Sequence, residues 1–421
     1  MSNVNLRLRA GDINGVQLSG VQRFSGIPYA QAPTGPLRFR PPVAATWSGT
    51  LDATREMPVC PQLPSRLRGV MGDFEATQSE DCLKLTVWTP AADHKKRPVV
   101  VWFHGGAWQS GGGALDWYDG AALSRLGDVV VVGVNYRLAA LGWLYVPGET
   151  CNVGLLDHEA ALDWVEQHIA DFGGDPTRVT AMGQSAGGFN IAAMLTRQPK
   201  FQRAILQSAS LGRGFRDADT ADELSQVFLQ AAGVSSLDQA RALPVESLLK
   251  AQQAEPVVAA LKAEGANRSL FCPVMDGLVI DNTNPDLLKL AAGRVDVLAG
   301  YTKNEMAAFP GTPVDARSDA LGEEIFGAPA RQWANHARAQ GRHAWVFRFD
   351  YGPNPDHGAC HCIELPFMFG NLDAFAQAPF LKGMDPAHGQ HLAGKMQRAW
   401  VAFIRDGSPG WDEAPHVHVY G

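Results

Sequence analysis

Short apolar runs alternate along this chain with segments whose apolar positions recur at helical spacing. Residues 99–103 show no polar alternation and end at a glycine pair, which is typical of a strand buried on both faces. Residues 158–172 place apolar side chains three and four positions apart before a second glycine pair, which predicts a helix. The same criteria predict further strands at 129–135, 179–182, 204–207, 295–299 and 344–349, and further helices at 186–195 and 390–404.

Strands that alternate with helices predict an α/β fold, in which a mostly parallel, twisted central sheet carries helices on both faces. The first hundred residues differ, because Asn14-Gly15, Gly26 and Pro28 punctuate them in the manner of hairpins. We therefore expect an N-terminal antiparallel β-ribbon that leads into the sheet. Residues 218–262 are rich in Ala, Gln and Leu, which indicates short surface helices. No repeat or linker divides the sequence, so one domain is expected over residues 1–421.

Charge and hydropathy exclude some classes of partner. The net charge is −7 and no run of basic residues stands out, which argues against binding to nucleic acid. No apolar stretch approaches the roughly 20 residues that span a bilayer. The first residues lack the apolar core of a signal peptide, so a cytoplasmic protein is expected, with secretion left open if a leader was removed. We expect a monomer or a weak homo-oligomer.

The segment Gly183-Gln184-Ser185-Ala186-Gly187 lies between a predicted strand and a predicted helix. This context indicates a nucleophile elbow rather than an ordinary Gly/Ser turn, and it makes Ser185 the candidate nucleophile. Glycines flank the serine because side chains there would collide with the neighbouring strand and helix. A serine hydroxyl needs a base to remove its proton, and the oxyanion that then forms needs hydrogen-bond donors.

A second glycine-rich segment, which begins at His104, follows the buried strand at 99–103. Its glycine pair lets the backbone N–H groups of Gly105 and Gly106 point toward the site, and the N–H of Ala186 would be a third donor to the oxyanion. For His104 itself we expect a structural role that holds this loop.

Together these segments resemble the type-B carboxylesterases, the family that includes cholinesterases and bacterial p-nitrobenzyl-type esterases. The resemblance covers most of the chain, and the number of motifs in the right order makes it specific. It implies the α/β-hydrolase fold, a carboxylic ester hydrolase with a covalent acyl-enzyme, and a mechanism without metal or cofactor. The matching segments are residues 24–30, 37–39, 79–85, 135–137, 154–157 and 172–176, followed by the elbow.

The resemblance also completes a catalytic triad. Glu305 ends the matching segment after the strand at 295–299, and His361 precedes a Glu-Leu-Pro-Phe segment as the family's histidine does. The order Ser, Glu, His is the one that an α/β-hydrolase requires. Taken alone, the cluster of His357, Cys360, His361 and Cys362 could pass for a zinc site, but no second cluster with ligand spacing accompanies it, so no metal is expected. Ser208 resembles a family serine that hydrogen-bonds near the acid and the histidine.

Departures from the family pattern restrict the range of substrates that we expect. Gln184 stands where cholinesterases carry a glutamate, and the segment between Cys60 and Cys82 lacks the tryptophan that would bind choline, so this is no cholinesterase. The stretch between Glu305 and His361 is shorter than in the family, which predicts a wider site under a reduced helical cap at about 215–270 and 306–340. A small neutral ester, either aromatic or with a short acyl group, is the expected substrate, selected by apolar residues near the site: Trp108, Phe189, Phe309 and Phe367.

Two alternatives remain at this stage. The same triad also serves amide, lactone and thioester hydrolases. A non-catalytic binding protein, like the neuroligin branch of the family, is disfavoured because all three triad residues are present.

The resemblance implies further contacts. Arg38 should pair with Glu80, and Arg137 with Asp157. Cys60 and Cys82 should be neighbours that could form a disulfide, or stay free thiols in a reducing cytosol. Ser185, His361 and Glu305 should form one hydrogen-bonded chain. If Glu364 or Asp281 holds the histidine instead, Glu305 is not the acid.

Overall fold

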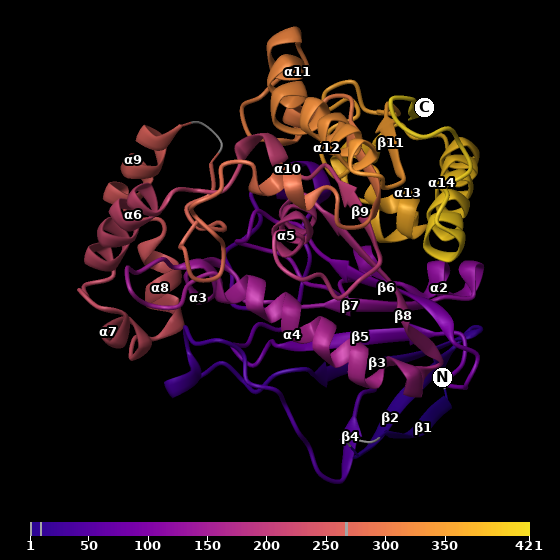
Figure 1. Cartoon of the computed structure of the whole chain (residues 1–421), viewed down its shortest axis with the longest axis horizontal. Helices are drawn as coiled ribbons and strands as arrows, with labels where there is room; N and C mark the ends of the chain where they lie inside the picture. The colour runs from indigo at the N-terminus through magenta and orange to yellow at the C-terminus, as the bar shows by residue number, and fades with distance from the viewer. Residues whose placement is uncertain (1, 9–10, 266–267) are drawn as a thin grey trace.

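The structure is a computed structural model that describes residues 2–8, 11–265 and 268–421, and a 12-stranded sheet runs through these residues (Figure 1). The strands follow one another across the sheet in the order β1 (Ser2–Leu8), β2 (Gly11–Leu18), β3 (Val21–Pro28), β5 (Lys84–Thr89), β7 (Val130–Val134), β6 (Arg97–Phe103), β8 (Gly174–Gln184), β9 (Arg203–Gln207), β10 (Asp296–Thr302), β11 (Ala344–Phe349) and β12 (Val417–Tyr420), with β4 (Thr50–Asp52) on β2.

The sheet has two parts of different character. From β1 to β7 neighbouring strands run antiparallel, which is the predicted N-terminal ribbon. From β7 through β6 to β12 every neighbouring pair is parallel. Every residue of β6 and β7 is buried, as expected for central parallel strands covered on both faces. The predicted α/β fold is therefore confirmed, including its mixed sheet.

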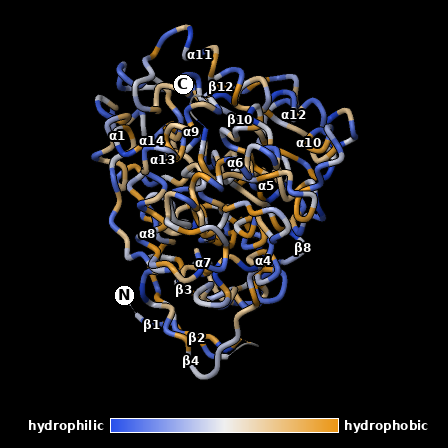
Figure 2. Tube along the Cα trace, turned by 90° about the vertical axis from the view of Figure 1, so that its left-hand side faces the viewer, coloured by the Kyte–Doolittle hydropathy of each residue, from blue (hydrophilic) through white to orange (hydrophobic). Residues whose placement is uncertain are grey.

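Helices cover both faces of the sheet. On one side α4 (Val153–His168) and α5 (Ala186–Met194) pack on β8, and α12 (Ala328–Ala339) packs on β10 and β11. On the other side α2 (Ala121–Gly127) contacts β5 and β7, while α14 (Pro386–Asp406) packs on α2, on β6 and on α13 (Leu365–Phe369). Hydrophobic positions concentrate in the interior of the molecule and hydrophilic ones along its outline (Figure 2).

The predicted strands and helices appear with shifted ends. The helix expected at 158–172 begins earlier, at Val153 directly after the left-handed Asn152, and its last turn tightens into a 3₁₀ helix, Ile169–Phe172, that ends at Gly173. The terminal helix α14 also starts before its predicted first residue, because the Asp385 side chain caps it by accepting a hydrogen bond from the His388 N–H. The strand at 344–349 has the predicted bounds.

Four short helices stand to one side of the sheet, at the left of Figure 1: α6 (Ala218–Ala231), α7 (Leu237–Arg241), α8 (Val245–Ala251) and α9 (Glu255–Glu264). The predicted pair of Arg38 and Glu80 is confirmed, with Arg38 Nε 2.7 Å from Glu80 Oε2. Arg38 Nη1 also donates to the carbonyl groups of Arg241 and Leu243, at 2.8 and 2.5 Å. One guanidinium therefore ties these helices to the N-terminal part of the chain. The remaining α-helices of the described residues are α1 (Arg68–Met71), α3 (Ala139–Trp143), α10 (Leu287–Ala291) and α11 (Ala316–Gly322).

Two other predicted contacts concern buried side chains. Arg137 and Asp157 form a bidentate pair at 2.8 and 2.6 Å, as predicted, with both side chains almost fully buried. Cys60 and Cys82 are neighbours whose thiols hydrogen-bond, and both are free, so the disulfide is not formed in this structure. The hydrogen bond with Cys60, together with burial, raises the pKa of Cys82, which keeps that thiol protonated.

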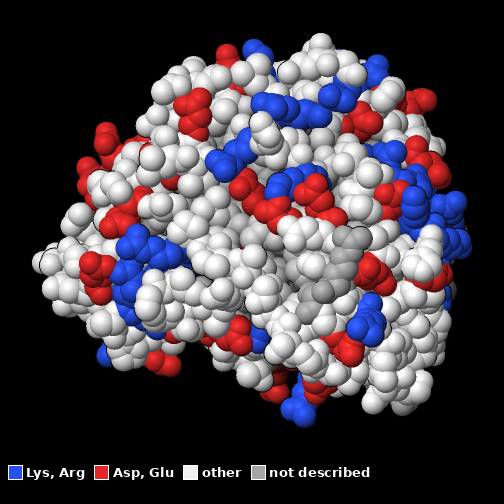
Figure 3. All heavy atoms as spheres, turned by 60° about the horizontal axis from the view of Figure 1, so that its bottom comes forward, with Lys and Arg blue, Asp and Glu red and all other residues white. Residues whose placement is uncertain are grey.

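Basic and acidic side chains intermingle on the face of the molecule that Figure 3 shows. Among the described residues, no helix is long and apolar enough to cross a membrane.

Candidate active site

Ser185 lies on a sharp turn between β8 and α5. Its backbone has φ 54° and ψ −119°, a strained conformation that the surrounding close packing holds in place. A Cβ atom at Gly183 would collide with the backbone of Gly187, and one at Gly187 would collide with the carbonyl of Phe103 at the end of β6. Glycine is therefore needed on both sides of the serine, for the steric reason predicted from the sequence.

The other predicted site residues follow neighbouring parallel strands. Gly105 and Gly106 come after β6, Glu305 after β10, and His361 after β11. The carboxyl ends of parallel strands meet at one edge of the sheet, which is where open α/β folds bind their ligands. The topology thus gathers residues from four distant parts of the sequence at the end of β8.

His361 and Glu305 form a buried pair. The imidazole Nδ1 lies 2.5 Å from Glu305 Oε2, and the other carboxylate oxygen accepts the N–H of Thr302 at 2.9 Å. Both side chains are only 1% exposed. The two loops are also joined through Asn304, whose N–H donates to the carbonyl of Ala359 and whose Oδ1 accepts the Ala359 N–H. Their geometry is therefore set by backbone as well as by side chains.

The expected hydrogen bond between His361 and Ser185 is not formed in this structure. The side-chain amide of Gln184 instead lies 3.1 Å from His361 Nε2. Since Nδ1 faces a carboxylate, it carries the ring proton, and Nε2 accepts from the Gln184 amide. The serine and the histidine lie at one site. Of the predicted series of hydrogen bonds, only the one between His361 and Glu305 is formed.

The segment after β6 supplies free backbone donors beside the serine. A Cβ atom at Gly105 would touch Gln184 and Ser185, so this glycine lies directly against the nucleophile turn. Within the described chain, the N–H groups of Gly105, Gly106 and Ala186 donate no hydrogen bond. Three backbone donors are thus unoccupied near Ser185, as expected for groups that would bind an oxyanion.

Aromatic residues and an asparagine fix this donor loop. Trp108 Nε1 donates to Asn190 Oδ1 of α5 at 2.7 Å, which links the loop to the helix that begins at Ala186. The His104 ring stacks on Tyr136 with centroids 4.4 Å apart. Burial lowers the pKa of His104 to about 4, so it is neutral near pH 7. These contacts support the structural role expected for His104.

Ser208 and Glu364 are buried polar residues in different hydrogen-bonding environments. Ser208 follows β9 with φ 44°, and its buried hydroxyl has no hydrogen-bond partner among the described residues, so the bond expected from the resemblance is absent. Glu364 was also, with Asp281, a carboxylate that could have held the histidine in place of Glu305, but His361 Nδ1 contacts Glu305. Glu364 is fully buried, and burial together with the charge of Glu305 raises its pKa to about 8.

A small pocket, partly open to solvent, adjoins Ser185. Of the four aromatic residues predicted for it, Trp108 and Phe309 line the pocket. Phe189 and Phe367 do not, which corrects the prediction: Phe189 packs edge-on behind Trp108, and Phe367 packs on Phe349 in the core. Phe326, missed in the sequence, also lines the pocket and lies 5.0 Å from the His361 ring. Arg66, Arg213 and Arg268 complete its rim.

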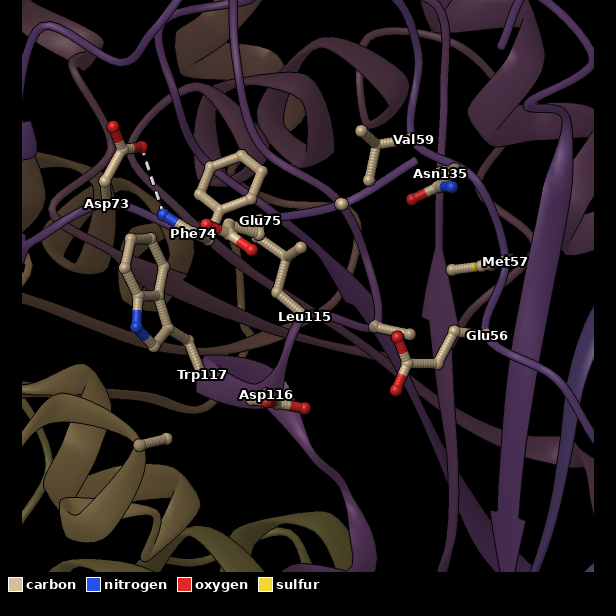
Figure 4. Close-up of a pocket in the computed structure, with 13 residues that line it drawn as sticks. Glu56, Met57, Val59, Asp73, Phe74, Glu75, Leu115, Asp116, Trp117 and Asn135 are labelled. Atoms are coloured by element: carbon tan, nitrogen blue, oxygen red, sulfur yellow. Dashed lines mark hydrogen bonds between the residues drawn. The ribbon is translucent and has the colours of Figure 1, made fainter. Parts of the chain in front are cut away.

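A larger hollow lies outside this site (Figure 4). It is lined by aromatic residues and four carboxylates, Glu56, Asp73, Glu75 and Asp116, and by none of the triad residues. No group of three or more His, Cys, Asp or Glu in the described parts of the chain is arranged to hold a metal ion. In the His/Cys cluster considered as a zinc site, His361 is engaged by Glu305 and Gln184.

Comparison with known proteins agrees with this geometry. The carboxylesterase family matches residues 2–316. The chain is 35% identical to the para-nitrobenzyl esterase of Bacillus subtilis, over 95% of this chain and 89% of that protein. It is 38% identical to a protein of Rhodococcus erythropolis named as a probable N-octanoylanthranilate hydrolase, over 92% of this chain and 90% of the relative. A solved PNB esterase structure superposes with a TM-score of 0.88 at 31% identity, over 100% of this chain and 96% of that one.

Proposed function

This chain belongs to the carboxylesterase family and is a carboxylic-ester hydrolase, and we propose that Ser185, His361 and Glu305 are its catalytic triad. The observation that carries the proposal is the buried 2.5 Å contact between His361 and Glu305 beside a serine held at φ 54°. A strained serine next to an oriented imidazole is the arrangement that activates a hydroxyl for acyl transfer.

The mechanism follows from these positions. Ser185 Oγ attacks the ester carbonyl while His361 Nε2 takes its proton, and Glu305 holds the ring tautomer and stabilises the imidazolium. The N–H groups of Gly105, Gly106 and Ala186 bind the oxyanion. His361 then protonates the departing alkoxide, which leaves an acyl-enzyme, and water repeats the sequence to release the acid. The Gln184 amide must leave Nε2 before the first proton transfer.

The pocket supports an ester with an apolar, aromatic portion. Trp108, Phe309 and Phe326 line it and offer ring faces to an acyl or alcohol group. An N-acyl substrate is a second candidate, because one relative is named as an N-octanoylanthranilate hydrolase and the same triad cleaves amides. We also propose that residues 1–421 form one domain, since the sheet joins strands from both ends of the chain, with a reduced cap at about 215–270 and 306–340.

A labelling experiment tests the triad. A fluorophosphonate should modify Ser185 and abolish hydrolysis of 4-nitrophenyl butyrate, and mass spectrometry of the digested protein locates the adduct. Ser185→Ala should lose both labelling and turnover, because both depend on the same oxygen. Ser210→Ala is the matched control, since Ser210 lines the same pocket without a place in the triad. Turnover that survives Ser185→Ala would refute the proposal.

A further inference from the structure

Three arginines from separate segments meet at the pocket that holds the nucleophile. Arg66 precedes α1, Arg213 ends the 3₁₀ helix Leu211–Arg213 after β9, and Arg268 follows α9. No aspartate or glutamate is among the described residues that line this pocket, although Ser210 and Ser269 add two hydroxyl groups. The pocket is therefore lined by three cationic groups and neutral side chains.

Two of these arginines lack a counter-charge within the described chain. Neither Arg66 nor Arg213 forms an ion pair with a carboxylate there. The Arg66 guanidinium lies over the ring of Phe309, 5.2 Å from its centroid, and both residues face the pocket. A guanidinium without a carboxylate partner can offer its hydrogen-bond donors to a ligand.

The carboxylate of Glu264, which lies beside Arg268, already pairs with another arginine. Glu264 accepts two hydrogen bonds from the buried Arg216, at 2.9 and 2.7 Å, and reaches Arg268 only at 3.9 Å. One carboxylate thus neutralises Arg216 and leaves the three pocket arginines with an excess of positive charge. Desolvation and the charges of Arg66 and Arg268 lower the pKa of Arg213 to about 10, so it is still charged at neutral pH.

Like charges gathered without partners cost stability, and an anionic ligand would relieve that cost. Carboxylate geometry matches the guanidinium fork, and the neighbouring serine hydroxyls can donate to the same oxygens. Arg66 also lines the adjoining pocket, beside Gly106 and Ala107 of the donor loop. An anion held at this rim would therefore belong to a molecule whose carbonyl reaches the oxyanion donors.

We propose that the preferred substrates are esters that carry a carboxylate, which Arg213, Arg268 and Arg66 bind while the ester carbonyl faces Ser185. This assignment rests on the proposed function and replaces the expectation of a neutral substrate. The aromatic residues of the pocket bind the apolar portion between the two groups. The carboxylate can lie on either the acyl or the alcohol side, because the arginines surround the pocket from three segments.

Two pairs of esters test the proposal and separate the two sides. Mono(4-nitrophenyl) glutarate is compared with 4-nitrophenyl valerate for an anionic acyl group, and 3-acetoxybenzoate with 3-acetoxybenzamide for an anionic alcohol. After subtraction of spontaneous hydrolysis, the charged ester of at least one pair should have a kcat/KM at least tenfold that of its neutral counterpart at low ionic strength. That ratio should fall as salt is added, since exposed charges are screened.

Variants connect the preference to the arginines. Arg213→Gln and Arg268→Gln should each lower the ratio about tenfold, the range expected for a lost hydrogen bond to a charged group. Arg213→Lys keeps the positive charge and should lower this ratio less than Arg213→Gln does. Arg55→Gln is the matched control, because the Arg55 side chain is 87% exposed and does not line the pocket. Benzoate should inhibit the wild type competitively, and Arg213→Gln should weaken that inhibition.

The outcomes are distinguishable. A ratio near one in both pairs, with turnover that still requires Ser185, would overturn the substrate class and leave the triad intact. If Arg213→Gln lowered kcat/KM equally for the charged and the neutral esters, the arginine would support the fold instead of binding the carboxylate. Turnover that does not require Ser185 would overturn the proposed function itself.

Discussion

The side-chain amide of Gln184 lies 3.1 Å from Nε2 of His361, on the nitrogen that must accept the proton of the serine. In the proposed mechanism, the residue directly before the nucleophile therefore contacts the proton-accepting nitrogen of the base. This contact orients the imidazole together with Glu305 at Nδ1. Replacement of the amide by a carboxylate would place a negative charge against the ring.

The first prediction concerns Gln184→Glu. A carboxylate beside the imidazole favours the protonated ring, so a higher pH is needed to produce the neutral base. The acid limb of the kcat/KM profile should move to higher pH by about one unit. Gln184→Leu removes the amide without adding charge and should move the limb less than Gln184→Glu does. The measurement is kcat/KM for 4-nitrophenyl butyrate between pH 5 and pH 9, and an unmoved limb in Gln184→Glu would contradict the contact.

The second prediction separates the two buried carboxyl groups near His361. Glu305→Gln should lower kcat about 10⁴-fold, the loss known for the corresponding amide replacement in a serine triad, because the imidazolium is no longer stabilised. Glu364→Gln is the matched control, since Glu364 is equally buried but bonds to Gln207 instead of the histidine. A larger loss in Glu364→Gln than in Glu305→Gln would reverse the assignment of the acid.

The sequence predicted those parts of the site that depend on local steric demands. The elbow is an example, because the close approach of α5 and β6 requires glycine at positions 183 and 187. Both glycines can be recognised from the five residues around Ser185. The parallel order of the strands also followed from their apolar runs. It brings Ser185, Glu305 and His361 to one edge of the sheet whatever the loops between them do.

Features that depend on how distant loops pack were not predictable. Arg66, Arg213 and Arg268 show no common spacing, and they meet only because the segments around α1, β9 and α9 converge on the nucleophile. Phe367 was assigned to the pocket as an apolar residue near the site, but it lies on α13 and packs on Phe349. Periodicity shows that a side chain is buried and leaves open whether it faces the core or a pocket.

The third prediction concerns the buried pair of Arg137 and Asp157, whose side chains are 2% and 0% exposed. Asp157→Asn should lower the free energy of unfolding by about 3–5 kcal/mol, because it leaves a buried guanidinium without its counter-charge. Glu149→Gln is the matched control: its partner is Arg40, the two side chains are 39% and 46% exposed, and the loss should stay below about 1 kcal/mol. Urea denaturation measures both, and equal losses would contradict the role of burial.

The last prediction links Glu364 to the pH dependence of stability. Burial and the charge of Glu305 raise the pKa of this carboxyl from an ordinary 4.5 to about 8. Below pH 4.5 the folded and unfolded states both hold the proton, and the group has no effect on the difference between them. As the pH rises toward 8 the unfolded chain releases the proton while the folded chain keeps it, so the folded state loses stability, and above pH 8 the loss stays constant.

Glu364→Gln removes this titration while keeping a neutral side chain of similar shape. The difference in unfolding free energy between variant and wild type should therefore shift in favour of the variant between pH 5 and pH 8, by a few kcal/mol at about 1.4 kcal/mol per unit of pKa difference. Other groups titrate alike in both proteins and cancel in the difference. Glu324→Gln, at an exposed position on the same protein, should show no such shift. A difference for Glu364→Gln that is the same at both pH values would mean that this carboxyl does not hold its proton in the folded state.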